Sequence, residues 1–256
     1  MSTLNQKPPF FIVGSVRSGT TILRDVLRIH KDLVCPEETH FFRWSFPFGA
    51  TEYKNNYLNK VLRVHRSIDK VSDEKMMELL DTCHSRKDFS GKYIEEFIKS
   101  TGANPESRWF DKTPQNLYNL MLISAEFLHS RFIHIYRNPL NVVASLKVGE
   151  VMSAKNNIES ANYWREATMI SHQFSRCFPN RVMTIRYDDF TNKPNEIMGQ
   201  LCEFIGEENI FKDEDLSFVR PETPKYKDVL TDEEIKLTKK IVQPAMDFTG
   251  YEFDDY

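Results

Sequence analysis

Short apolar segments alternate with longer stretches of helical apolar periodicity along most of the chain. The apolar segments predict strands at residues 10–13, 33–35, 108–110, 131–136 and 182–187. The 3.6-residue periodicity predicts helices over residues 18–30, 116–127, 138–148, 158–177, 194–205 and 231 to about 248. Because strands and helices alternate, we expect an α/β fold with a parallel β-sheet and helices on both faces.

The stretch from about Thr51 to Ser100 interrupts this alternation. Its apolar positions recur with helical spacing in three groups, which predict three helices with no strand between them. The chain has neither an internal repeat nor a linker rich in proline, glycine or serine. We therefore expect one domain over residues 1–256, with a helical insertion at about residues 43–107.

Composition narrows the classes of protein to consider. The net charge of −3 over 256 residues argues against nucleic-acid binding through overall charge. The four cysteines stand far apart without a C-x-x-C pair, and none of the seven histidines has the spacing of a metal site, so we expect no metal. No run approaches ~18 apolar residues, so no membrane span is predicted and a cytoplasmic location is the default expectation.

A loop bracketed by two glycines, Gly14 and Gly19, lies between the first predicted strand and the helix that follows it. Such a loop presents backbone N–H groups and a helix N-terminus to an anion. Its spacing is that of the phosphate-binding loop G-x-x-x-x-G-K-[ST], but Thr20 occupies the lysine position and the basic residue is Arg17. We therefore expect a P-loop-type α/β sheet.

The absence of that lysine changes the expected chemistry. A nucleoside triphosphatase uses the lysine on its β- and γ-phosphates, together with a magnesium ion. A donor of a sulfuryl group carries less charge at its reacting end and can do without the metal. The competing interpretation is structural, with the two glycines forming a turn that caps an ordinary helix.

Three kinds of segment carry a resemblance to a known family. The segment FFIVGSVRSGTTILRDVL resembles the 5′-phosphosulfate-binding loop of sulfotransferases that use 3′-phosphoadenosine-5′-phosphosulfate (PAPS). RFIHIYRNPLNVVASL resembles the 3′-phosphate-binding motif of the same family, and supplies Arg137 and Ser145. CPEETHFF and FDKTP resemble segments of its protein-tyrosine branch and bacterial small-molecule relatives. The resemblance covers roughly residues 10–42, 108–149 and 181–206.

The expected topology brings the candidate residues to one edge of the sheet. In an open parallel sheet, ligands bind beyond the carboxyl ends of the strands. The residues that follow or end a predicted strand are Arg17, Glu37, Glu38, Lys112, Arg137 and Tyr187. Two arginines, a lysine and a carboxylate pair at one edge predict an anion site that also contains a base.

The resemblance assigns the nucleotide to two groups of residues. The 5′-phosphate is expected at the backbone N–H groups and side chains of Arg17, Ser18, Gly19, Thr20 and Thr21. The 3′-phosphate is expected at Arg137 and Ser145, because an arginine fork suits phosphate. The alternative for Ser145 is a buried helix serine bonded to backbone.

The sequence departs from the tyrosine branch at the 3′-phosphate. Gly149 stands where that branch has a second phosphate-binding arginine. Lys225 and Lys227 are candidates to replace it, with exposed loop lysines as the alternative. Tyr187 is a candidate for stacking on the adenine, although a core position is the stronger interpretation.

The reacting centre is expected at three residues. Arg17 and Lys112 are expected to neutralise the sulfuryl and departing phosphate oxygens. By the resemblance, Glu38 is the general base that deprotonates the acceptor, and His40 is the second candidate. The alternatives are that Lys112 merely pairs with Asp111 and that Glu38, like Glu37, is a first-turn helix acid.

The leading functional hypothesis is sulfuryl transfer from PAPS to a hydroxyl or amine of a small-molecule acceptor, such as a natural product, with release of 3′,5′-ADP. Residues 43–107 are expected to supply the acceptor pocket, and the glutamates favour a cationic acceptor. The alternatives are a P-loop kinase, in which Asp188 would bind magnesium, and a non-catalytic nucleotide-binding protein. The sequence predicts no nucleic-acid or membrane partner and leaves the oligomeric state open.

Overall fold

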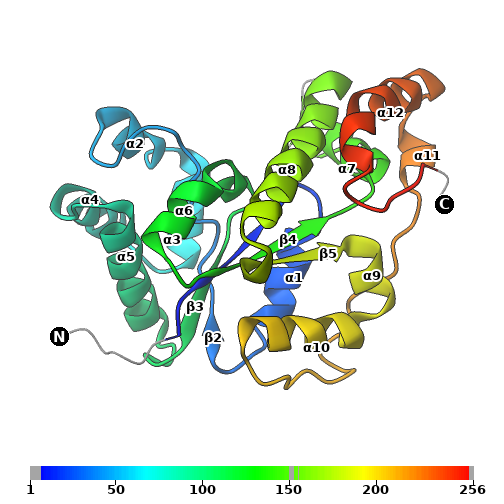
Figure 1. The fold of residues 1–256 in the computed structure, drawn as a ribbon. Coiled ribbons are helices and arrows are strands. Elements are labelled where there is room, and N and C mark those ends of the chain that lie inside the picture. The colour runs from blue at the N-terminus through cyan, green and yellow to red at the C-terminus, as the bar shows by residue number, and fades with distance from the viewer. Residues whose placement is uncertain (1–6, 150–152, 155, 254–256) are drawn as a thin grey trace.

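A parallel sheet forms the centre of the molecule. The computed structural model describes residues 7–149, 153–154 and 156–253. Within these residues, five parallel strands follow the order β2-β3-β1-β4-β5 (Figure 1). They are β1 Phe10–Val13, β2 Leu33–Val34, β3 Arg108–Lys112, β4 Arg131–Tyr136 and β5 Val182–Arg186. The predicted α/β fold with a parallel sheet is confirmed.

Each of the four connections between consecutive strands contains at least one helix, as predicted. The helices outside the insertion are α1 Thr20–Leu27, α6 Leu120–Glu126, α7 Pro139–Lys147, α8 Asn157–Cys177, α9 Tyr187–Asn192, α10 Pro194–Ile205, α11 Tyr226–Val229 and α12 Asp232–Met246. Two short 3₁₀ helices, η1 Pro114–Asn119 and η2 Pro179–Arg181, precede α6 and β5. A capping box formed by Thr231 and Glu234 opens α12.

The segment between β2 and β3 is helical, but it contains four helices rather than the predicted three. They are α2 Thr51–Asn56, α3 Lys60–Ile68, α4 Asp73–Thr82 and α5 Arg86–Thr101. The first predicted helix is divided because the side chain of Asn59 accepts a hydrogen bond from the Val61 N–H and caps a new helix. Figure 1 shows these helices together on one side of the sheet.

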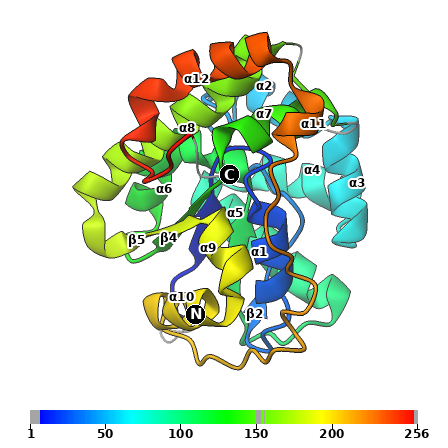
Figure 2. The same ribbon diagram turned by 90° about the vertical axis from the view of Figure 1, so that its right-hand side faces the viewer.

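The sheet buries both of its faces, and alternate residues of β1 show how. Phe11 and Val13 belong to a core shared with the insertion helices and α8. Phe10 and Ile12 belong to a second core shared with α1 and α10. Figure 2 shows α1, α9 and α10 grouped on the second face. The unbroken apolar segment predicted a strand buried on both faces, and the structure agrees.

Three strand ends differ from the prediction, and all lie at the carboxyl edge of the sheet. β2 stops at Val34 instead of continuing to Cys35. β3 continues through Asp111 to Lys112, so the lysine ends the strand instead of following it. β5 stops at Arg186, and Tyr187 begins the unpredicted helix α9. Among the described residues, none of the helices combines the length and the hydropathy of a membrane span.

Candidate active site

The glycine-bracketed loop after β1 packs tightly against its surroundings. A Cβ atom on Gly14 would lie 2.4 Å from the carbonyl oxygen of Ile135 in β4. A Cβ atom on Gly19 would lie 2.2 Å from the ring of Tyr187, and Gly19 also has a φ of 95°. Both positions therefore exclude a side chain, because there is no space for one and, at Gly19, the backbone is left-handed.

The loop leaves hydrogen-bond donors for an anion. α1 starts at Thr20 without a side-chain cap and without an acidic residue in its first turn. The first N–H groups of a helix have no intrahelical partner, and they carry the positive end of its dipole. The Ser18 hydroxyl is buried and has no hydrogen-bond partner among the described residues. These donors fit the 5′-phosphate that the resemblance assigns to this loop.

Backbone strain occurs at two of the predicted site residues. Among the described residues other than glycine, only Arg17, His40 and Lys70 have a positive φ. Arg17 has a φ of 67° in the loop, and His40 has a φ of 55° after β2. Such conformations persist where the surrounding structure imposes them, and they concentrate at functional sites.

A cavity of about 1120 Å³ opens beside this loop. The predicted site residues that line it are Arg17, Gly19, Thr20, Thr21, Glu38, His40, Arg137, Ser145 and Tyr187. The insertion contributes α2, α3 and the segment between them to the opposite wall, including Asn55, Leu58 and His65. The cavity therefore joins the loop to the predicted acceptor segment.

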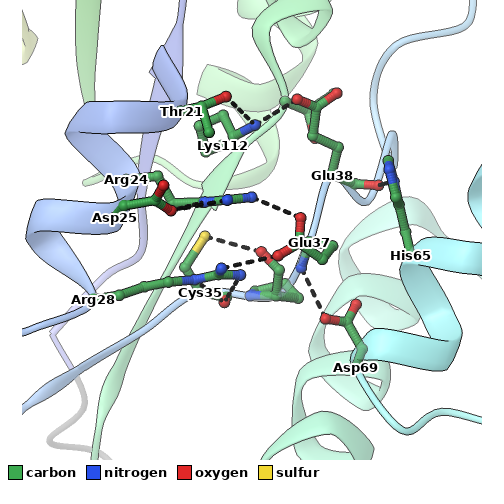
Figure 3. Close-up of polar contacts among 12 residues, drawn as sticks. Thr21, Arg24, Asp25, Arg28, Cys35, Glu37, Glu38, His65, Asp69 and Lys112 are labelled. Carbon is green, nitrogen blue, oxygen red and sulfur yellow. Dashed lines mark hydrogen bonds and ion pairs between the residues drawn. The ribbon is translucent and has the colours of Figure 1, made fainter. Parts of the chain in front are cut away.

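Lys112 and Glu38 form an ion pair at this cavity. The Nζ atom of Lys112 contacts Oε1 of Glu38 and donates to the Thr21 hydroxyl at 3.2 Å (Figure 3). The Lys112 side chain is 2% exposed, whereas that of Glu38 is 27% exposed and reaches the cavity. The ion pair of Lys112 is thus with Glu38 and not with Asp111, contrary to the alternative considered from the sequence.

The end of β3 also holds the segment that carries Glu38. The Thr39 hydroxyl donates to the buried carboxylate of Asp111. The Thr113 hydroxyl accepts from the backbone N–H groups of Thr39, at 3.1 Å, and His40, at 3.3 Å. Burial raises the pKa of Asp111 to about 6. Three consecutive residues at and just after the end of β3, Asp111 to Thr113, therefore hold the consecutive residues 38–40.

His40 is a neutral neighbour of Glu38. Its Nε2 atom lies 3.7 Å from Oε2 of Glu38, and its side chain is 6% exposed. Burial, and then the positive charge of Arg43, lower the pKa of His40 to about 3. The ring of His65 of α3 stacks beside that of His40, with centroids 6.4 Å apart, and its Nδ1 atom lies 3.1 Å from the backbone carbonyl oxygen of Glu38 (Figure 3). Nothing in the sequence marked His65 as a site residue.

The two arginines predicted at the nucleotide have partners from distant segments. Nε of Arg17 donates to the Ser145 hydroxyl of α7 at 2.8 Å. Arg137 uses Nε and Nη2 to bind both oxygens of Glu222, and its guanidinium lies 5.0 Å from the Tyr187 ring centroid. The Glu222 side chain is 2% exposed. Glu222 had no sequence signal beyond its place between two prolines.

The remaining predicted residues lie away from the cavity. Lys225 and Lys227 are exposed and do not line it, and the ammonium of Lys227 lies 6.0 Å from the Tyr226 ring. Glu37 is held between Arg24, at 2.7 Å, and Arg28, at 2.9 Å (Figure 3). Burial opposes its ionisation, but Arg28 and Arg24 keep the pKa of Glu37 below its ordinary value. No helix begins at Glu37 or Glu38, so neither is a first-turn helix acid.

Comparison with known proteins identifies the family. Residues 8–213 match the Sulfotransferase family. The chain belongs to this family. The predicted resemblance to sulfotransferases is thereby confirmed, and the P-loop-type fold is that of the family.

Relatives of this sulfotransferase family member are distant in sequence. Protein-tyrosine sulfotransferase 2 of Gallus gallus is 24% identical over 211 residues, which are 78% of this chain and 52% of that protein. The chain spans no more than about half the length of the curated relatives that it matches.

Two solved sulfotransferase domains share the fold, each with a TM-score of 0.65. The domain from the olefin synthase of Synechococcus PCC 7002 is 18% identical, and the likeness covers 100% of this chain and 93% of that one. The domain from the curacin biosynthetic pathway is 21% identical, with coverage of 97% and 99%.

Proposed function

We propose that the protein transfers a sulfuryl group from PAPS to a hydroxyl or amine of a small-molecule acceptor and releases 3′,5′-ADP. The observation that carries this proposal is the ion pair of Glu38 and Lys112. It lies between the cavity and the glycine-bracketed loop of residues 14–19, called the anion loop below. It puts a carboxylate, the proposed base, and a cation side by side where the strand ends meet. Family membership supports sulfuryl transfer as the reaction class.

The nucleotide is assigned to the loop and to α7. The first-turn N–H groups of α1, together with Ser18, Thr20 and Thr21, hold the 5′-phosphate. The guanidinium of Arg137 and the Ser145 hydroxyl hold the 3′-phosphate, and Tyr187 borders the same space. When bound, PAPS supplies the sulfuryl group.

Glu38 is the proposed base. Its Oε1 atom is occupied by Lys112, so Oε2 is the atom available to accept the acceptor's proton. His40 is the weaker candidate, since its pKa of about 3 makes its imidazole a poor proton acceptor. Nε2 of His40 instead lies where it can orient the acceptor or the Glu38 carboxylate.

Arg17 and Lys112 supply the positive charge at the reacting centre. Both side chains are held in place before a ligand arrives, Arg17 by Ser145 and Lys112 by Thr21 and Glu38. Preorganised cations stabilise developing charge without reorganisation during the reaction. We propose that these two residues do this work without a metal ion.

The kinase alternative lacks support at its expected metal ligand. A kinase would need Asp188 beside the phosphate loop. Asp188 instead accepts a hydrogen bond from the Tyr251 hydroxyl and does not line the cavity. The position of Asp188 therefore favours the sulfotransferase.

Ligand binding and transfer test the proposal in sequence. We expect 3′,5′-ADP to raise the melting temperature without magnesium and by more than Mg-ATP does; a preference for Mg-ATP would refute the assignment. A screen of hydroxyl and amine acceptors with ³⁵S-labelled PAPS then tests transfer. Glu38→Gln should keep 3′,5′-ADP binding and lose about 10²–10⁴-fold in transfer rate. Glu95→Gln, an exposed glutamate of α5, is the matched control.

A further inference from the structure

Some of the described charged side chains that line the cavity have a partner of opposite charge, and others do not. Among the described lining residues, the carboxylates are Asp25 and Glu38. Asp25 is bound by Arg24, with Nε at 2.9 Å and Nη2 at 2.8 Å, and Glu38 is bound by Lys112. Each carboxylate therefore already has a cationic partner, so neither is an unpaired negative charge that would by itself select a cationic ligand.

One lining arginine has no polar partner for its guanidinium among the described residues. Arg17 donates to Ser145, and Arg137 binds Glu222. The guanidinium of Arg43, by contrast, forms no ion pair or hydrogen bond with any residue that the structure describes. Its Cζ atom lies 5.9 Å from the ring centroid of the neighbouring Trp44. A half-buried cation without an anion is unfavourable unless a ligand supplies one.

The backbone around Arg43 is held firmly. Arg86 donates to the carbonyl oxygens of Phe41, at 3.0 Å, and Trp44, at 2.8 Å. Asn119 donates to the carbonyl oxygen of Phe42 at 2.6 Å and to that of Arg43 at 3.3 Å. Because these bonds fix the main chain, the Cα atom of Arg43 has a fixed position in the cavity wall.

Arg43 is close to the proposed base. Its N–H donates to the His40 carbonyl oxygen at 3.3 Å, two residues beyond Glu38. Burial lowers the pKa of Arg43, while Tyr163, Glu38 and Tyr118 are the groups whose charges act on it in the opposite direction. The guanidinium therefore lies within electrostatic range of the atom that is to receive the acceptor's proton.

We propose that Arg43 binds an anionic group of the acceptor, a carboxylate, phosphate or sulfate, while the acceptor's hydroxyl lies at Glu38. This inference rests on the proposed function and names its substrate class. The nucleotide's phosphates and sulfate are already matched to Arg17, Lys112 and Arg137, so Arg43 is left for the acceptor. Its planar fork suits a carboxylate or phosphate.

The test uses matched probes that differ only in charge. Calorimetry measures the binding of 4-hydroxyphenylacetate, 4-hydroxyphenylacetamide and tyramine to the protein saturated with 3′,5′-ADP. The aliphatic set of 6-hydroxyhexanoate, its amide and 6-aminohexanol repeats the comparison on a second scaffold, and 4-hydroxyphenyl phosphate distinguishes phosphate from carboxylate. The variants are Arg43→Gln, Arg43→Lys and, as a control, Arg176→Gln, which removes an exposed arginine of α8.

The expected order of affinity is anion, then neutral probe, then cation. Arg43→Gln should weaken the anionic probe by about tenfold and abolish the preference, Arg43→Lys should restore part of it, and Arg176→Gln should change nothing. A wild-type protein that does not prefer the anion, or a preference that survives Arg43→Gln, overturns the inference. Weaker 3′,5′-ADP binding in Arg43→Gln also overturns it, because Arg43 would then serve the nucleotide. Failure of the wild type to bind 3′,5′-ADP would instead refute the proposed function.

Discussion

Gly19 offers a direct measure of how tightly the anion loop is packed. Gly19→Ala introduces two separate penalties, a left-handed backbone at φ 95° and a Cβ atom 2.2 Å from the Tyr187 ring. Gly49 provides the matched control, because its φ is 88° and nothing lies within 4 Å of a Cβ atom there. The difference between the two alanine variants isolates the contact with Tyr187.

The magnitudes follow from these two penalties. A left-handed alanine costs about 1–2 kcal/mol, part of which is offset by the reduced entropy of the unfolded chain. Gly49→Ala should therefore lower the free energy of unfolding by about 1 kcal/mol. Overpacking adds about 1–3 kcal/mol, so Gly19→Ala should lower it by about 2–4 kcal/mol. For a protein of this size, these losses correspond to melting temperatures roughly 3 °C and roughly 9 °C lower.

Urea denaturation and thermal scans measure both variants. The same substitution in a Tyr187→Ala background completes a double-mutant cycle, in which the loss at Gly19 should shrink to that at Gly49. Equal losses of unfolding free energy in Gly19→Ala and Gly49→Ala would refute the reasoning. So would a loss in Gly19→Ala that is the same with and without the Tyr187→Ala substitution. Gly19→Ala should also weaken 3′,5′-ADP binding, since Tyr187 must move into the cavity.

Two further predictions concern buried charges. Glu222→Gln should tighten 3′,5′-ADP binding by about tenfold, because a neutral amide no longer competes with the 3′-phosphate for Arg137; calorimetry that finds unchanged or weaker binding contradicts this. The free energy of unfolding should fall by about 1.4 kcal/mol per pH unit from pH 6 to pH 5, as measured by urea denaturation. Unfolding lets His40 and His134, whose pKa values burial lowers to about 3 and about 4, return to their ordinary pKa of 6.5 and take up two protons. Asp111, whose pKa burial raises to about 6, releases about one proton on unfolding, which leaves a net uptake of about one. His134→Gln should therefore nearly abolish the pH dependence of the free energy of unfolding. An unchanged pH dependence in this variant would exclude this origin.

The anion loop and the sheet edge were predictable because both depend on local signals. An apolar strand followed by two glycines and a helix specifies a loop whatever the rest of the chain does. Parallel topology then places Arg17, Lys112 and Arg137 at one edge, and the structure has them there. The resemblance added Glu38, which the sequence alone could not distinguish from Glu37.

Pairings between irregular segments were not predictable. Arg137 and Glu222 are 85 positions apart, and the loop that carries Glu222 has no periodicity to place it. The same holds for Glu37, which pairs with the buried Arg24 of α1 and with Arg28 just after that helix, and for the lack of a carboxylate at Arg43. The extra helix of the insertion was missed because Asn59, a capping residue, lay inside an apolar pattern that continued past it.

The contacts of β3 with the segment around Glu38 have a consequence for folding. Asp111 bonds to Thr39, and Lys112 pairs with Glu38. Two adjacent β3 residues of opposite charge thus contact two adjacent residues of the segment that carries Glu38. A one-residue slip that brought Asp111 to the register opposite Ile12 of β1, which Lys112 now occupies, would present Glu38, the proposed base, with a carboxylate in place of an ammonium. Under the proposed mechanism, mispaired chains would lack transfer activity even if compact, so specific activity per molecule would report how faithfully the sheet has aligned.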